Sequence, residues 1–158
     1  MRSGKVTVEQ IDGLVTWTLI RAAHRVERSL TELFAERGLT PIQFGVLAQL
    51  ATGEPLTQAE LARAVLVRPQ SMAELIGGMV DRGLLVRTGS RGRGRPNPIA
   101  LSDQGAELLE RIWPAVLAAN DLTRLGFTTA QSEELNARLH ELLQRSGTDE
   151  PWSRPAQG

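Results

Sequence analysis

The sequence predicts a mainly α-helical protein with one small β-hairpin. Apolar residues recur at steps of three and four through most of the 158 residues, which is the periodicity of amphipathic helices. Near the middle of the chain this pattern stops, and two short β-prone runs flank a stretch rich in glycine and arginine. Two such runs joined by a flexible loop are typical of a β-hairpin.

The first helix is expected to be long and to end near Arg37. Apolar residues from Ile11 to Leu33 follow helical spacing over about six turns. Gly38 comes next, and glycine favours the left-handed conformation that often ends a helix.

Three shorter helices are expected to follow. Thr40 and Thr57 each stand three residues before a glutamine or glutamate, which is the pattern of a capping box at a helix start. The third of these helices is expected to begin at Pro69, because proline suits the first helical position. Gly83 is expected to terminate it.

The predicted hairpin comprises residues 84–88 and 99–101. The loop between these runs carries Arg91, Arg93 and Arg95 and contains no acidic residue. The loop is therefore expected to form a flexible basic tip.

Two further helices complete the predicted fold. Ser102 is expected to cap the first, and Pro114 is expected to kink or break it. The second is expected to begin at Thr128 or Thr129 and to carry a stripe of leucines. The chain beyond Ser146 is polar and is expected to be disordered.

Composition excludes several classes of function. The chain has no cysteine and only two histidines, so we expect no disulfide, no metal site and no cofactor. No nucleophile grouping or phosphate-binding glycine loop is present, so we do not expect an enzyme. The sequence lacks both a run of about 20 apolar residues and an apolar signal core. We therefore expect a cytoplasmic protein that does not bind membranes.

Charge is balanced overall but unevenly distributed. The net charge of the chain is zero, yet the segment from Arg68 to Pro96 contains six arginines and two acidic residues and so has a local net charge of +4. A basic centre in an otherwise acidic chain is suited to a protein that contacts a polyanion through one element.

Two helices joined by a tight turn and followed by a basic hairpin are suited to recognising DNA bases in the grooves. This order of elements predicts a winged helix-turn-helix domain. A helix fits the major groove, and arginines at a hairpin tip can reach the adjacent minor groove. We expect residues 57–65 to form the supporting helix and residues 69–82 the reading helix. The candidate DNA contacts are Arg68, Pro69, Gln70, Ser71, Met72, Glu74, Arg87, Arg91, Arg93 and Arg95.

Four segments resemble the MarR family of bacterial regulators. They are residues 39–44 (LTPIQF), 56–62 (LTQAELA), 83–87 (GLLVR) and 101–105 (LSDQG), and the resemblance extends over about residues 8–145. Two positions depart from the family pattern. Arg93 stands where an aspartate is common in the wing, and Glu74 stands where an arginine is common in the reading helix.

The resemblance implies a homodimer that binds double-stranded DNA at a near-palindromic operator. Members usually act as repressors, and a small ligand, often aromatic or phenolic, releases many of them from DNA. The implied effector pocket is lined by Trp17, Arg21, His24, Phe44 and Trp113. The implied dimerisation residues are Ile11, Leu14, Leu117, Leu135, Leu139 and Leu142.

The resulting division of the chain has four parts. They are an N-terminal dimerisation helix and pocket wall (1–37), the winged domain (38–101), C-terminal dimerisation helices (102–146) and a disordered tail (147–158).

Less specific interpretations remain open. The wing arginines can be a solvated loop, the aromatic residues can be packing residues, and the leucine stripes can belong to an enlarged monomeric core. The zero net charge and Glu74 also allow a winged-helix protein-interaction module, or an anti-repressor, without specific DNA binding.

Overall fold

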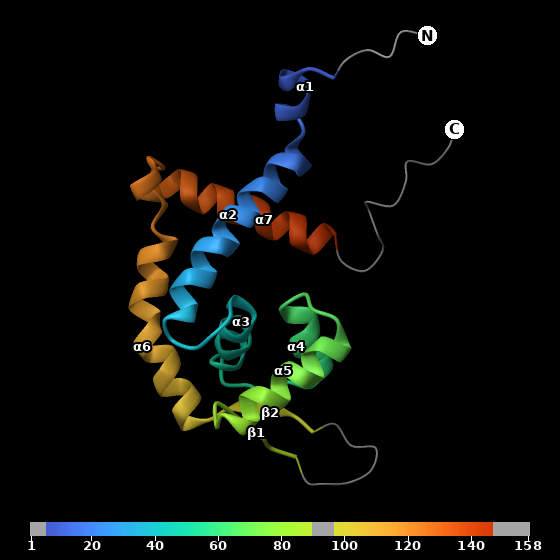
Figure 1. The fold of residues 1–158 in the computed structure, drawn as a ribbon, viewed down its shortest axis with the longest axis vertical. Coiled ribbons are helices and arrows are strands. Elements are labelled where there is room, and N and C mark those ends of the chain that lie inside the picture. The colour runs from blue at the N-terminus through green and yellow to red at the C-terminus, as the bar shows by residue number, and fades with distance from the viewer. Residues whose placement is uncertain (1–5, 90–96, 147–158) are drawn as a thin grey trace, which may run out of the picture. The chain divides into compact units, whose positions relative to one another are not determined.

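The computed structural model describes residues 6–89 and 97–146, and the chain divides into two units, Met1–Ala115 and Val116–Gly158 (Figure 1). The first unit contains α1 (Val8–Asp12), α2 (Val15–Ala35), α3 (Pro41–Leu50), α4 (Gln58–Ala64), α5 (Pro69–Asp81), β1 (Leu85–Arg87), β2 (Ile99–Leu101) and most of α6 (Asp103–Asn120). The second contains the end of α6, the 3-10 helix η1 (Leu122–Leu125) and α7 (Thr129–Arg145). This arrangement confirms the predicted fold class. Within the described ranges, no helix is both long and apolar enough to cross a membrane.

Capping boxes set the starts of four helices. In each box the threonine hydroxyl accepts a hydrogen bond from the backbone amide of the residue three positions later. The side chain of that residue accepts in turn from the threonine backbone amide. The threonines are Thr7, Thr40, Thr57 and Thr128. The predicted starts of α3, α4 and α7 are confirmed. In the box of α4, the Thr57 amide and hydroxyl donate to the Glu60 carboxylate and hold the pKa of that group below its ordinary value.

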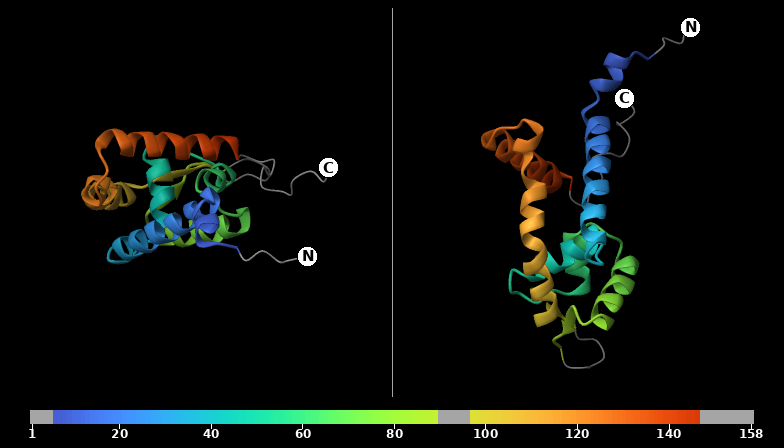
Figure 2. Two further views of the ribbon diagram at one scale, coloured as in Figure 1. Left: turned by 90° about the horizontal axis from the view of Figure 1, so that it is seen from above. Right: turned by 60° about the vertical axis from the view of Figure 1, so that its left-hand side comes forward.

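The hairpin is fixed on both sides of β2. β1 and β2 pair antiparallel, with Leu85 opposite Leu101 and Arg87 opposite Ile99. On the other edge, Leu56 and Ile99 exchange backbone hydrogen bonds of 2.8 and 3.0 Å. The hairpin and α5 lie towards one end of the first unit, and α1 lies at the opposite end (Figures 1 and 2).

One hydrophobic core occupies the first unit, between α3, α4, α5, the hairpin and the adjoining ends of α2 and α6. Its buried apolar side chains are Phe34, Leu39, Val46, Leu47, Leu50, Leu61, Ala62, Met72, Ile76, Met79, Leu84, Leu85, Ile99, Leu109 and Ile112. α1 and α7, in contrast, bury no residue among those described.

The first helix differs from the prediction. It is broken at Gly13 and Leu14, because Leu14 adopts an extended conformation (ψ 97°) as the N-cap of α2. Its second part ends at Ala35, two residues before the predicted end, and Gly38 then takes the expected left-handed conformation (φ 67°). The apolar spacing continues across the break, so periodicity alone did not reveal it.

α6 begins as predicted and continues through its proline. The Ser102 hydroxyl accepts from the Gly105 amide (2.9 Å) and donates to the Gly83 carbonyl (2.6 Å), which ties the helix start to the end of α5. Pro114 lies inside the helix, which runs on to Asn120 without the predicted break. The predicted disorder beyond Ser146 concerns residues 147–158, which lie outside the described residues.

Candidate nucleic-acid interface

The N-terminal half of α5 presents a polar face to solvent. Arg68, Pro69, Gln70, Ser71 and Glu74 are all exposed. The Arg68 side chain, at the N-cap position, makes no capping hydrogen bond, unlike the threonines at the starts of α3 and α4. The amides of Gln70 and Ser71 precede the first intrahelical hydrogen bond and so are available to an external acceptor.

The prediction that Met72 contacts DNA is wrong. Its side chain is fully buried, together with Ile76 and Met79. Steps of four and three along a helix place these residues on one face, and that face packs into the core. Met72 therefore supports the exposed face from behind and is removed from the candidate DNA contacts.

The turn between α4 and α5 positions the reading helix. Gln58 Nε2 donates to the Pro69 carbonyl across this turn (3.4 Å). The Val67 amide donates to the Ala62 carbonyl (3.0 Å), a hydrogen bond across five residues that closes the end of α4. The same kind of closing hydrogen bond ends α2 and α5. In those two helices the left-handed residue of the closure is Gly38 or Gly83, whereas α4 uses Leu66 at φ 55°.

Leu66→Gly is expected to stabilise the protein by about 0.5–1 kcal/mol. A non-glycine residue in the left-handed region costs about 1–2 kcal/mol, part of which is offset because glycine is more flexible in the unfolded chain. Leu66 is 75% exposed, so little packing is lost. Urea denaturation measures the effect. Ala64→Gly at the end of α4 is the matched control, and it is expected to destabilise by about 0.5–1 kcal/mol. A Leu66→Gly variant less stable than wild type would contradict this account.

The base of the hairpin presents one predicted contact to solvent. Arg87 is exposed at the end of β1. Beyond it, the Thr88 amide bonds to the Pro98 carbonyl (2.8 Å), and the Gly89 amide bonds to Asn97 Oδ1 (3.2 Å). Arg91, Arg93 and Arg95 fall within residues 90–96, which lie outside the described residues.

Charged groups around the reading helix have different roles. Arg82 Nη2 donates to the Gly38 carbonyl (2.7 Å), so this arginine links the end of α5 to the α2–α3 turn. Glu74 forms no ion pair with any residue in the described ranges. Within those ranges its carboxylate has no cationic partner, and an exposed carboxylate can accept a hydrogen bond from a DNA base.

The predicted effector residues separate into two groups. The Phe44 ring stacks on Phe34 (centroids 4.6 Å apart) and lies 6.4 Å from the Trp113 ring. Beside Trp113 is a groove of about 360 Å³. Trp17 lies 17 positions before Phe34 on α2, about 25 Å away along the helix at 1.5 Å per residue. Within one chain, Trp17 therefore does not share a site with Phe44.

The other predicted pocket residues on α2 face solvent. Arg21 and His24 are exposed, and Arg21 pairs with Asp12 of α1 at 3.6 Å. Sequence reasoning did not identify Phe34, which stacks on Phe44 beside Trp113. Phe34 continues the helical step from Leu30, but the apolar stripe had been placed on Leu33 instead.

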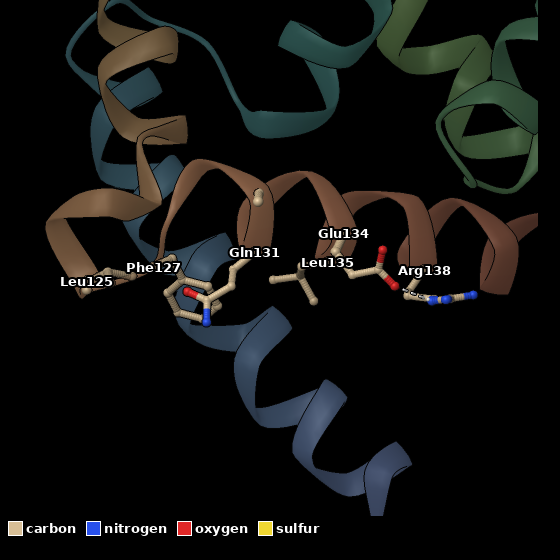
Figure 3. Close-up of a pocket in the computed structure, with 8 residues that line it drawn as sticks. Leu125, Phe127, Gln131, Glu134, Leu135 and Arg138 are labelled. Atoms are coloured by element: carbon tan, nitrogen blue, oxygen red, sulfur yellow. Dashed lines mark hydrogen bonds and ion pairs between the residues drawn. The ribbon is translucent and has the colours of Figure 1, made fainter.

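The predicted dimerisation residues are accessible in each unit. Ile11 and Leu14 in the first unit and Leu117 and Leu135 in the second are exposed, while Leu139 and Leu142 are half-buried. A hollow of about 690 Å³ in the second unit is lined by apolar side chains of η1, α7 and the loop between them, together with Gln131 and the Glu134–Arg138 ion pair (Figure 3).

Comparison with known proteins identifies a family. The model of the MarR family matches residues 37–96. An uncharacterized HTH-type transcriptional regulator of Bacillus cereus is 32% identical over 133 residues, covering 84% of this chain and 86% of the relative. The HTH-type transcriptional repressor Rv2887 of Mycobacterium tuberculosis is 29% identical over 131 residues, with 83% and 94% covered.

Solved structures show the same similarity. The MarR family protein Rv2887 in complex with salicylic acid has a TM-score of 0.66 at 29% identity, covering 83% of this chain and 97% of that one. Its complex with DNA has a TM-score of 0.66 at 27% identity, with 83% and 98% covered. The relatives' names describe regulators and no enzyme. From the family model and the Bacillus cereus relative together, the chain belongs to the MarR family of helix-turn-helix transcriptional regulators.

Proposed function

We propose that this protein is a homodimeric, sequence-specific DNA-binding repressor whose affinity for its operator falls when a small ligand binds. The observation that carries the proposal is the uncapped, exposed start of α5, whose polar side chains and free amides face solvent. The Rv2887 complexes with DNA and with salicylic acid support it.

The reading helix enters the major groove by its N-terminal half. Gln70 offers both an amide donor and a carbonyl acceptor, which match the edge of adenine. The free amides of Gln70 and Ser71 suit phosphate oxygens at the positive end of the helix. Glu74, one turn later, can accept from a cytosine amino group.

The wing supplies further contacts. Arg87, exposed at the end of β1, is assigned to a phosphate beside the groove that α5 occupies. Arg91, Arg93 and Arg95, on the loop between the strands, are assigned to the flanking minor groove, where negative potential attracts guanidinium groups.

Dimerisation covers the exposed apolar residues of the terminal helices. Ile11 and Leu14 on the first unit and Leu117 and Leu135 on the second lack cover within their own units. A twofold axis lets identical patches bury each other. Two reading helices then meet successive major grooves about 34 Å apart.

Arg87→Ala tests the DNA-binding role with a described residue. Loss of one phosphate contact is expected to weaken binding several-fold on every sequence and to reduce the salt slope by about 1. Arg111→Ala is the matched control, because Arg111 is an exposed arginine that pairs with Glu107 on α6 and is not among the candidate DNA contacts. Fluorescence anisotropy in a salt series measures both. Equal slopes for the two variants would count against the proposed interface.

A further inference from the structure

A groove of about 360 Å³ lies in the first unit between the end of α3 and α6. It is lined by Ala48, Ala51, Leu109, Glu110, Trp113 and Pro114. The small side chains of the two alanines leave space for the groove beside the C-terminal part of α3. The volume is suited to a ligand at the small end of the usual range for binding pockets.

Glu110 is the one ionisable residue among those that line the groove. Within the described part of the chain it forms no ion pair, whereas Glu107, one turn earlier, pairs with Arg111 at 3.9 Å. Glu110 is exposed, so the groove carries at its edge one carboxylate that has no cationic partner among the described residues.

Trp113 is held in place and still partly open. Its ring lies 6.4 Å from Phe44, which in turn stacks on Phe34. The indole nevertheless remains 44% exposed. The negative face of an indole attracts a cation, and tryptophan does so best among the aromatic residues.

Pro114, the residue after Trp113, adds an apolar ring to the lining of the groove.

We propose that this groove binds a hydrophobic ammonium ion, such as an aromatic amine in its protonated form. The apolar walls accept the rings, and the indole and the Glu110 carboxylate attract the charge. An aromatic carboxylate of the same size is disfavoured by Glu110. The regulatory consequence, release of DNA, rests on the proposed function, but the binding itself does not.

Isothermal titration of the full chain with three compounds that share one ring system tests the proposal. 1-Naphthylmethylamine, protonated at pH 7, is expected to bind about tenfold more tightly than 1-naphthylmethanol, and 1-naphthoate more weakly than either. Glu110→Gln is expected to weaken amine binding about fivefold and to leave alcohol binding unchanged. Glu107→Gln, on the same helix outside the groove, is the matched control and is expected to change none of the three.

A second variant tests the location by volume. Ala51→Leu fills the groove and is expected to weaken the amine and the alcohol alike. Naphthoate binding as tightly as the amine, or an unchanged amine-to-alcohol ratio in Glu110→Gln, would overturn the proposal. These titrations contain no DNA. Failure of the DNA-binding proposal appears separately, as absence of complex formation without any ligand.

Discussion

Gly105→Ala is expected to destabilise the protein by about 3 kcal/mol and to lower its melting temperature by roughly 10 °C. Gly105 is buried in the first turn of α6, where the helix crosses the hairpin. An added Cβ would overlap the Leu84 carbonyl oxygen and approach Leu101 Cδ1 at 2.9 Å. The nearest obstacle is backbone, so no side-chain rotation relieves the overlap.

The cost follows from what must move. To make room, α6 has to shift away from the strands. That shift breaks the hydrogen bonds that the Ser102 hydroxyl makes with Gly83 and Gly105, and it opens the core at Leu84. Overpacking of a close contact typically costs about 1–3 kcal/mol, and loss of a helix cap adds about 1 kcal/mol.

Gly78→Ala is the matched control for this prediction. Gly78 lies in α5, has a helical conformation, and an added Cβ meets nothing within 4 Å. The same substitution there is expected to stabilise by about 0.5–1 kcal/mol, because alanine is the better helix former. If the close contact at Gly105 decides the outcome, urea denaturation will show a lower free energy of unfolding for Gly105→Ala and a higher one for Gly78→Ala than for wild type. Wild-type stability for Gly105→Ala would refute the packing described at the wing exit.

Gln70→Ala is expected to reduce affinity for the operator by about 5- to 150-fold, equivalent to 1–3 kcal/mol for a lost bidentate base contact. The loss is expected on the cognate sequence and not on random DNA, since phosphate contacts are retained. Gln70 is exposed in the first turn of α5 and makes no hydrogen bond that stabilises the fold among those described. The variant is therefore expected to melt at the wild-type temperature.

Gln49→Ala provides the comparison for Gln70→Ala. Gln49 is likewise an exposed glutamine on a helix, α3, outside the candidate interface. Binding curves on operator and on random fragments separate the two outcomes. An equal loss on both kinds of DNA, or none on the operator, would exclude Gln70 from base recognition.

Helix starts were predictable from sequence because capping is local. A threonine and the residue three positions later contain all the groups that a capping box needs, as at Thr40 and Thr57. The hairpin strand at residues 99–101 was predicted for a similar reason, since β-prone residues follow a glycine-rich loop directly.

Features that depend on packing between distant segments were not predictable in the same way. Met72 was predicted as a DNA contact from its place in the first half of α5, although its spacing to Ile76 and Met79 already puts it on their apolar face. Phe34 was missed because its partner, Phe44, belongs to another helix. The role of Glu110 emerges only when α6 and α3 enclose a groove.

Selection of genomic fragments on the purified protein, followed by footprinting in a salt series, tests the central claim most directly. The account predicts enrichment of an inverted repeat of roughly 16–20 base pairs, with protection on both half-sites and affinity that falls steeply as salt rises. The contrary result is weak binding at low salt with no sequence enriched. That outcome would contradict the repressor and favour a winged-helix module that binds another protein.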